Sequence, residues 1–321
     1  MSNAFKIVMH EVVCPKCGCK TVVKKGMRKT RFGMVQRYLC KRCSRYFADN
    51  PLPRCTYHPR IIYHALNHYN MGCSLQKTRS LVNKQFKINV GKTTIHSWIT
   101  KYQSICPILS IREQYKDAED VIFKKRFEHE NLSYEFMYHQ YKLQRYASRR
   151  FPGLFKYICG FESGCPDEFF EIGERCSKPK FKVDVKVRAQ VNLACRMADF
   201  AVLSKRINRE RHSLVENFML INDTATVACE LPVWYWEKSI DSGVTGHIDM
   251  VQIRGGNVVI MDYKPGANRD RKAAQQLYHY AVALSFRTQV PFGHIRCAWF
   301  DENRYFEYNP KLASAKLIKW K

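Results

Sequence analysis

The residues best suited to chemistry are two aspartates and a lysine in the C-terminal third of the chain. Asp249 lies in one apolar run and Asp262 in the next, and Gly255 and Gly256 between them predict a β-hairpin turn. Such a hairpin brings the two carboxylates together, where their oxygens can bind Mg²⁺ or Mn²⁺. Lys264 follows Asp262 by two positions and points to the same face of the strand. Its ammonium can orient or help deprotonate an attacking water and offset charge on a phosphate. The pattern predicts metal-dependent hydrolysis of a phosphodiester.

A helical pattern follows the hairpin and carries two further candidates. Gln276 and Tyr280 have i, i+4 spacing, so they lie one turn apart on one helix face. Gln275 and His279 form the alternative register in the same helix. A less specific interpretation of the whole group is a surface hairpin with an exposed ion pair, followed by a helix with a buried tyrosine.

Taken in order, these elements resemble the motifs of one nuclease family. Gly246 precedes Asp249 in a Gly-x-x-Asp pattern, Asp-x-Lys follows the turn, and Gln-x-x-x-Tyr follows in the helix. The combination is similar to the RecB-like clade of the PD-(D/E)XK nuclease superfamily and covers residues 205–310. The resemblance implies an α/β fold of the restriction-endonuclease type, a mixed sheet flanked by helices. It also implies that the two acids bind metal, that the lysine is catalytic, and that Gln276 and Tyr280 position the substrate.

The same resemblance implies a further metal ligand, His or Glu, on a helix upstream of the sheet. Residues 209–220 have a helical pattern in which His212 and Glu216 lie one turn apart. We take His212 as the candidate ligand and His129 as a weaker alternative. A solvated helix face would explain the same pair of residues.

Two smaller expectations come from the resemblance. Glu230 begins the strand before the hairpin, and family members often carry a glutamate there, so it is a second candidate to support the metal site. Some relatives hold an iron–sulfur cluster through one upstream cysteine and three near the C-terminus. Only Cys297 lies beyond Cys229 here, so no iron–sulfur cluster is expected.

Four cysteines near the N-terminus have metal spacing. Cys14 and Cys17 form one Cys-x-x-Cys pair, and Cys40 and Cys43 form another, which predicts a structural Zn²⁺ site in a zinc ribbon over residues 10–52. The metal would supply much of the folding energy of so small a unit. Basic side chains around the ribbon suit phosphate contacts, although a solvated basic face is the alternative. These candidate DNA-binding residues are Lys24, Lys25, Arg28, Arg31 and Arg37.

Residues 57–104 predict three short helices. Ser74 suits the N-cap of the second helix, and the third has a buried stripe at helical spacing. That stripe consists of Ile95, Trp98, Ile99 and Tyr102. The start of the third helix then presents outward the side chains that a recognition helix offers to the major groove: Lys92, Thr93, His96 and Ser97. Together with the ribbon, this region resembles the DNA-binding region of insertion-sequence transposases over residues 12–104.

The composition favours a polyanionic partner. Lys and Arg number 54 against 28 Asp and Glu, which gives a formal net charge of +26 over 321 residues. The sequence has no apolar run long enough for a transmembrane helix and no visible signal peptide. The 14 cysteines are therefore expected in a reducing compartment, cytoplasmic or nuclear. We expect DNA as the partner, double-stranded for the N-terminal region, and no membrane association.

The expected organisation is a zinc ribbon, a helix-turn-helix region and a nuclease domain over residues 105–321. Cys106 and Pro107 suit a linker. Residues 115–157 interleave aromatic with basic residues. Aromatic side chains beside basic ones can stack on nucleobases and contact phosphates, but the same residues can form an amphipathic helix that packs on the nuclease core. We favour the helix.

The predicted function is a Mg²⁺- or Mn²⁺-dependent deoxyribonuclease that its N-terminal region targets to DNA. The alternative is a DNA-binding regulator or mobile-element accessory protein with an inactive nuclease fold. The intact Asp249, Asp262 and Lys264 argue against that alternative. An RNA-directed enzyme is a third option, which a comparison of substrates would decide.

Overall fold

The structure, a computed structural model, describes residues 14–317 apart from 15, 31–32, 49–55, 119, 130–131, 168, 170–173, 177–180, 185–186, 239–240 and 271. The chain divides into two compact units, Met1–Pro59 and Arg60–Lys321. Within the described residues, no helix combines the length and the apolar character needed to cross a lipid bilayer.

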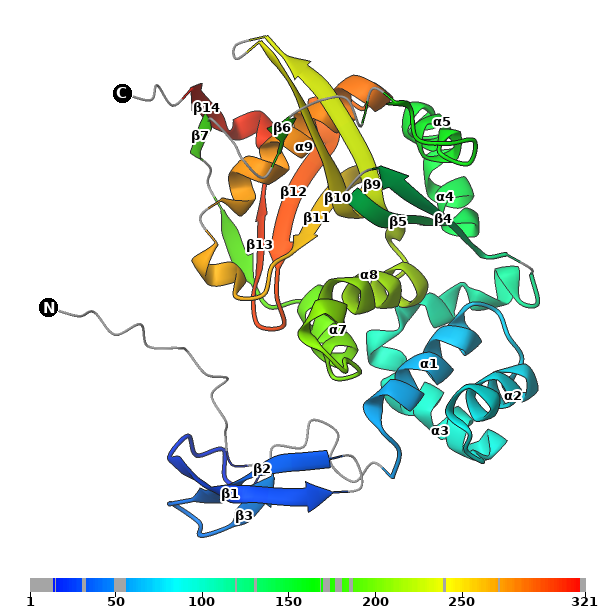
Figure 1. The fold of residues 1–321 in the computed structure, drawn as a ribbon, viewed down its shortest axis with the longest axis vertical. Helices are drawn as coiled ribbons and strands as arrows, with labels where there is room; N and C mark the ends of the chain where they lie inside the picture. The colour runs from blue at the N-terminus through cyan, green and yellow to red at the C-terminus, as the bar shows by residue number, and fades with distance from the viewer. Residues whose placement is uncertain are drawn as a thin grey trace, which may run out of the picture. The chain divides into compact units, whose positions relative to one another are not determined.

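The N-terminal unit is a three-stranded antiparallel sheet. β1 (Val22–Thr30) pairs with β2 (Gly33–Cys40), which pairs with β3 (Tyr46–Ala48) (Figure 1). Among its described apolar side chains, those buried are Cys14, Tyr38 and Cys40. So small a core leaves the unit dependent on another source of stability.

The second unit begins with the three predicted helices, α1 (Pro59–Asn70), α2 (Leu75–Phe86) and α3 (Lys92–Tyr102). Ser74 caps α2, because its hydroxyl accepts a hydrogen bond from the backbone N–H of Lys77 at 3.1 Å. The predicted stripe of α3 is buried, at Ile95, Trp98, Ile99 and Tyr102. The outward positions of α3 are exposed, at Lys92, Thr93, His96 and Ser97.

Residues 103–160 differ from the expectation. Three short 3₁₀ helices occupy the predicted linker, at Gln103–Ile105, Pro107–Ser110 and Arg112–Tyr115, and Cys106 is buried. The next segment, expected to be helical, is an antiparallel hairpin of β4 (Ile122–His129) and β5 (Leu132–His139). Only the following segments are helical, α4 (Gln140–Ala147) and α5 (Pro152–Gly160).

The helical expectation failed for β5 because burial alternates with a period of two over residues 133–136, while residues 136–139 are all buried. Tyr134 and Phe136 are buried and alternate with the exposed Ser133 and Glu135. Tyr134, Phe136 and Tyr138 all belong to the main hydrophobic core. Core packing therefore accounts for these aromatic residues, as favoured, but from a strand.

The remaining elements complete the second unit. Its other strands are β6 (Glu174–Arg175), β7 (Phe181–Asp184), β8 (Arg188–Gln190), β9 (Thr226–Glu237), β10 (Ser242–Arg254), β11 (Asn257–Tyr263), β12 (Ile295–Phe300), β13 (Tyr305–Tyr308) and β14 (Ser314–Leu317). Its other helices are α7 (Leu193–Val202), α8 (Arg211–Asn222) and α9 (Ala273–Thr288), with 3₁₀ turns at Asn208–Glu210, Ala267–Arg269, Phe292–His294 and Pro310–Leu312.

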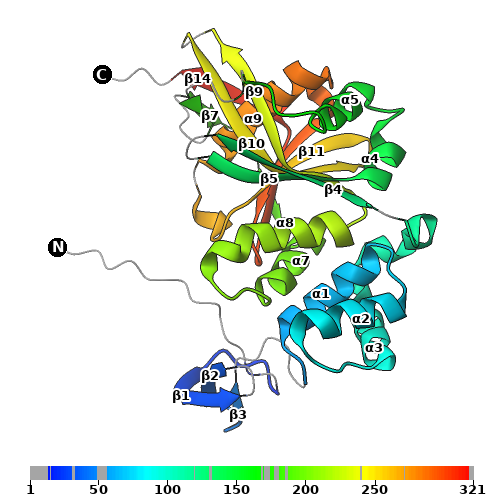
Figure 2. The same cartoon turned by 45° about the vertical axis from the view of Figure 1, so that its right-hand side comes forward.

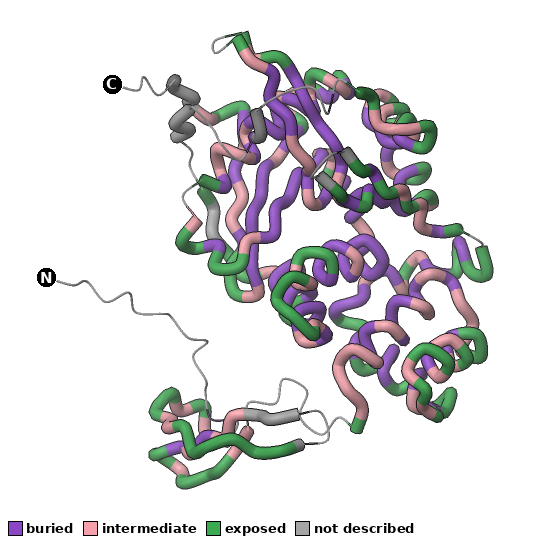
Figure 3. The backbone as a smooth tube through the Cα atoms, viewed as in Figure 1, coloured by how far each residue is buried: buried purple, intermediate pink, exposed green. Residues whose placement is uncertain are grey.

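A mixed sheet of nine strands forms the centre of this unit, in the order β4-β5-β9-β10-β11-β12-β13-β8, with β6 paired to β10. β9, β10 and β11 form an antiparallel meander, and α9 connects β11 to the parallel strand β12. The helices α9 and α8 lie on opposite sides of the meander (Figures 1 and 2). The central strands are largely buried (Figure 3). This is the mixed α/β sheet with flanking helices that the resemblance implies.

The predicted turn between β10 and β11 is present. Arg254 pairs with Asn257, and Gly255 and Gly256 between them have φ values of +54° and +74°. Two successive positive φ values match the type I′ hairpin turn, which favours glycine at both positions. The turn fixes the register of the strands that carry the candidate acids.

Buried asparagines join α1 to α8. The side-chain amide of Asn222 donates to Asn67 Oδ1 at 2.7 Å, and Asn70 donates to Asn222 Oδ1 at 2.6 Å. Nearby, the Tyr63 hydroxyl donates to the carbonyl oxygen of Leu214 at 3.0 Å. This buried polar network fixes α1 against α8.

We expect Asn222→Ala to lower the free energy of unfolding by about 2–4 kcal/mol, because it leaves two buried amides without their partner. Urea denaturation followed by circular dichroism measures this. Asn217→Ala is the matched control on the same helix, since the Asn217 amide donates to the Ser213 carbonyl and, among the described residues, to no other helix. Equal losses in the two variants would contradict a special role for the asparagine joint.

Candidate active site

The hairpin brings the predicted acids and the lysine together. The β10–β11 register sets Asp249 opposite Asp262. Lys264 Nζ lies 2.9 Å from Asp262 Oδ2, and Asp249 Oδ2 accepts a hydrogen bond from the backbone N–H of Tyr263 at 3.0 Å. The Asp262 side chain is 1% exposed and that of Lys264 25%. The three side chains form one cluster that is most open at the ammonium group.

The helix α8 adds two further side chains to this cluster. One ligand atom each from His212, Glu216 and Asp249 lies within 4.8 Å of the others, and His212 Nδ1 is 3.7 Å from Asp249 Oδ2. Glu216 is 3% exposed, whereas the His212 side chain is 46% exposed. The alternative of a solvated helix face is therefore wrong at Glu216.

The sequence pattern favours His212 over Glu216 as the helix-borne ligand, but Glu216 is the more deeply buried of the two in the cluster. The signal was available: Leu214, Val215 and Phe218 surround it with apolar positions on α8, and all three are buried. A carboxylate within such a stretch must find a partner or a cation, because a lone buried charge is costly.

The electrostatics of the cluster are those of crowded acids. Burial and the neighbouring charge of Asp249 raise the pKa of Asp262 well above its usual value. Burial also opposes ionisation of Asp249, but hydrogen bonding with His212 and Asp262 outweighs it and lowers the pKa of Asp249. Burial raises the pKa of Glu216, and the charges of Glu230, Asp249 and Asp262 raise it further.

Lys264 stays protonated within this cluster. Burial alone would lower its pKa, but the carboxyl group of Asp262 outweighs the burial and raises the pKa above the usual lysine value. The lysine therefore contributes a positive charge at the site.

Glu230 lies within β9 and not at its start, which corrects the expectation. The register on either side, Cys229 with Met250 and Leu231 with Ile248, sets it opposite Asp249. Its φ of +52° is rare for a residue other than glycine and changes the direction of the side chain locally. Burial and the charge of Asp249 raise the pKa of Glu230 to about 8.

Gln276 and Tyr280 meet in the predicted register. The Gln276 side-chain amide donates to the Tyr280 hydroxyl at 2.7 Å. A Cβ atom at Gly246 would lie 2.5 Å from Tyr280 Cε1, so glycine is required for the tyrosine to pack there. In the alternative register, His279 Nδ1 lies 2.7 Å from the Tyr235 hydroxyl and belongs to the contact between α9 and β9.

These residues fit a divalent cation. Carboxylate oxygens and an imidazole nitrogen suit Mg²⁺ or Mn²⁺. Glu216 Oε1 is buried and has no hydrogen-bond partner among the described residues, so a cation would satisfy an atom that is otherwise left alone.

We expect Glu216→Gln to stabilise the metal-free protein while it weakens metal binding. An acid whose pKa is higher in the folded than in the unfolded state costs stability as the pH rises above its unfolded value. The gain in melting temperature should therefore be larger at pH 8 than at pH 5. Each kcal/mol added to the free energy of unfolding should raise the melting temperature by about 2–4 °C. Calorimetry in chelator measures it, with the exposed Glu128→Gln as control. A variant less stable than wild type at pH 8 would contradict this account.

The four predicted cysteines meet in the N-terminal unit. Their sulfur atoms lie within 4.8 Å of one another, with 3.5 Å between those of Cys14 and Cys43 and 3.6 Å between those of Cys17 and Cys40. Tetrahedral ligands at the usual Zn–S distance of about 2.3 Å are separated by about 3.8 Å, whereas a disulfide would need about 2.0 Å. The cluster is compatible with a zinc ribbon.

The predicted DNA-binding side chains of the N-terminal unit are largely exposed. Lys24, Lys25 and Arg28 lie on β1 and face solvent. Arg37 is half-buried, with its guanidinium 5.1 Å from the centre of the Tyr46 ring. Arg31 lies outside the described residues, as does the side chain of His129, the weaker ligand candidate.

The superfamily of this chain follows from a comparison with known protein families. A family model described as the PD-(D/E)XK nuclease superfamily matches residues 93–304. The chain therefore belongs to this superfamily, whose members are generally phosphodiesterase nucleases that use divalent metals. The match spans α8 and the β9–β10–β11 meander, and thus the whole cluster. No curated protein and no solved structure matches the chain.

Proposed function

We propose that this chain is a Mg²⁺- or Mn²⁺-dependent deoxyribonuclease of the RecB-like clade. The observation that supports this most is the convergence of Asp249, Asp262, Lys264 and Glu216 from three elements of a superfamily nuclease domain. Crowded acids in a buried site, among them Glu216 with its unpartnered Oε1 atom, are costly to maintain unless a cation binds them.

Each side chain then has a role. Asp249, Asp262 and Glu216 hold the cation, with His212 at the exposed edge and Glu230 in support. When bound, the cation supplies Lewis acidity and an activated water. Lys264 offers its positive charge to the phosphate, which its raised pKa favours over a role as proton acceptor. Gln276 and Tyr280 position the substrate strand.

We further propose that the N-terminal region delivers the enzyme to double-stranded DNA. The cysteine cluster would hold Zn²⁺ and so position the exposed basic side chains of β1. The helix α3 would enter the major groove with its outward side chains, Lys92, Thr93, His96 and Ser97. The formal net charge of +26 agrees with a polyanionic partner. The resemblance to transposase DNA-binding regions favours the same role.

The deciding experiment incubates the purified chain with labelled single- and double-stranded DNA and RNA, in Mg²⁺, Mn²⁺ or chelator. We expect cleavage of DNA that chelator abolishes. Binding without cleavage of any substrate would favour the alternative, a DNA-binding regulator or mobile-element accessory protein with an inactive nuclease fold. Preferential cleavage of RNA would replace the deoxyribonuclease assignment by a ribonuclease.

A further inference from the structure

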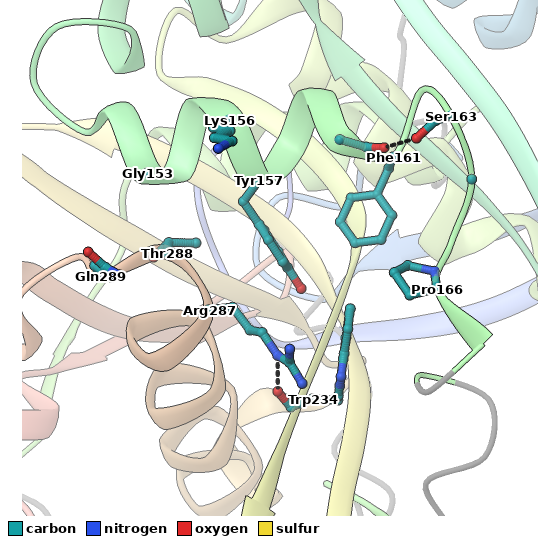
Figure 4. Close-up of a pocket in the computed structure, with 12 residues that line it drawn as sticks. Gly153, Lys156, Tyr157, Phe161, Ser163, Pro166, Trp234, Arg287, Thr288 and Gln289 are labelled. Atoms are coloured by element: carbon teal, nitrogen blue, oxygen red, sulfur yellow. Dashed lines mark hydrogen bonds between the residues drawn. The ribbon is translucent and has the colours of Figure 1, made fainter.

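Two adjoining cavities lie outside the carboxylate cluster. The larger, of about 590 Å³, is formed by α5, β9 and the C-terminal end of α9 (Figure 4). The smaller, of about 350 Å³, continues along β9 and α9 and shares Trp234 and Arg287 with it. We call this surface the aromatic–basic groove and define it by Lys156, Tyr157, Trp234, Trp236, Phe286 and Arg287.

The walls of the groove are held in place by hydrogen bonds. Arg287 donates its Nε–H to the carbonyl oxygen of Trp234 at 2.8 Å, and its guanidinium lies 3.9 Å from the centre of a Trp234 ring. The Tyr157 hydroxyl donates to the carbonyl oxygen of Pro232 at 2.8 Å. Figure 4 shows Tyr157, Trp234 and Arg287 facing the same cavity. The groove is therefore preformed and needs no ligand to assemble it.

The chemistry of the groove suits bases and phosphates. Trp236 is 58% exposed and Phe286 is 69% exposed, so two flat apolar faces are open to a ligand. The described residues that line the two cavities include Lys156, Lys238 and Arg287 and no acid. Aromatic faces beside cations bind unpaired nucleotides, because bases stack on the rings and phosphates meet the charges.

The groove lies along the same two elements that carry site residues. On α9, Arg287 follows Tyr280 by two helical turns, a rise of about 10 Å. On β9, Trp234 follows Glu230 by four residues, about 13 Å.

We propose that the aromatic–basic groove binds unpaired nucleotides of the strand being cut, to one side of the scissile phosphate. The bases would stack on Trp236 and Phe286, and Lys156 and Arg287 would meet the phosphates. This inference rests on the proposed nuclease function and specifies its substrate, a single-stranded segment or a single-stranded tail on a duplex.

The test measures binding in chelator, in the full-length chain with Lys264→Ala, so that cleavage is suppressed. Fluorescence anisotropy compares the binding of a labelled single-stranded oligonucleotide with that of a blunt duplex. The oligonucleotide has about 12 nucleotides, which lies within the usual site sizes of single-strand-binding folds. Trp236→Ala, Phe286→Ala and Lys156→Glu alter exposed side chains and should leave the fold intact. Each aromatic replacement should weaken single-strand binding by about five- to a hundredfold and leave duplex binding unchanged. Leu312→Ala and Lys311→Glu, both exposed, are the matched apolar and charge controls.

Two outcomes would overturn the proposal. Groove variants that bind the single strand as tightly as the controls would show that the nucleotides lie elsewhere. A change of oligomeric state in the groove variants alone, measured by light scattering, would instead assign the surface to a second copy of the chain. If the chain with Lys264 intact cleaves no substrate but single-strand binding still depends on the groove residues, the nuclease proposal would be wrong. The groove would then remain a site for unpaired nucleotides.

Discussion

Asp262→Asn and Lys264→Ala are each expected to slow DNA cleavage by at least about a hundred- to a thousandfold, with DNA affinity nearly unchanged. A preorganised charged group at a reacting phosphate has an effect of this size in other enzymes. Asp262 is buried, and its Oδ2 atom lies 2.9 Å from Lys264 Nζ, so either change removes one half of the charge pair. Single-turnover cleavage of labelled DNA with Mg²⁺ or Mn²⁺ measures the rate, and binding is measured in chelator.

The matched control for the aspartate is Asp167→Asn, because Asp167 is exposed and is not one of the acids of the cluster. It should cleave at the wild-type rate. Lys311→Ala is the corresponding control for the lysine, on an exposed 3₁₀ turn. Full activity in either cluster variant would remove the catalytic assignment of that residue and leave the N-terminal region as a DNA-binding module.

Cys40→Ser is expected to release the metal and unfold the N-terminal sheet. The described part of this unit buries few apolar side chains, and structural zinc contributes about 10–16 kcal/mol to the folding of small zinc peptides. Metal analysis should find one Zn²⁺ for each wild-type chain and none in the variant. Hydrogen exchange should show lost amide protection in β1 and β2, while β9–β12 keep theirs.

Cys19→Ser is the control for this experiment. Cys19 lies close to the cluster in sequence, but its sulfur accepts a hydrogen bond from the backbone N–H of Thr21 at 3.3 Å and is not one of the four clustered sulfurs. This variant should keep its zinc. A wild-type chain purified without zinc, or a Cys40→Ser variant with unchanged protection in β1 and β2, would contradict a metal-stabilised ribbon.

Local patterns in the sequence predicted much of the site. Two-residue alternation and a Gly-Gly turn were enough to place Asp249, Asp262 and Lys264 on one hairpin, because strand pairing across a tight turn involves neighbours in the chain. The same holds for Gln276 with Tyr280, one helical turn apart, and for the paired cysteines of the ribbon. In each case the spacing itself fixes the geometry.

Other parts of the site depend on contacts between distant segments. The burial of Glu216, and with it the cluster of ligand atoms that it shares with Asp249, arises only when α8 packs against the meander. The left-handed backbone of Glu230, on the strand opposite Asp249, is likewise not visible in the sequence pattern. In β5, the mixture of aromatic and basic residues obscured the short alternation over residues 133–136.

The sequence by itself determined the chemistry of this protein: the acids, the lysine, the four cysteines and the helix that presents polar residues outward. The tertiary structure alone decided which helix residue completes the carboxylate cluster, how α1 is joined to α8 and where the aromatic–basic groove lies. The physical reason is range. Turns and helix faces are set by residues a few positions apart, whereas burial and desolvation depend on what the rest of the chain places around a side chain.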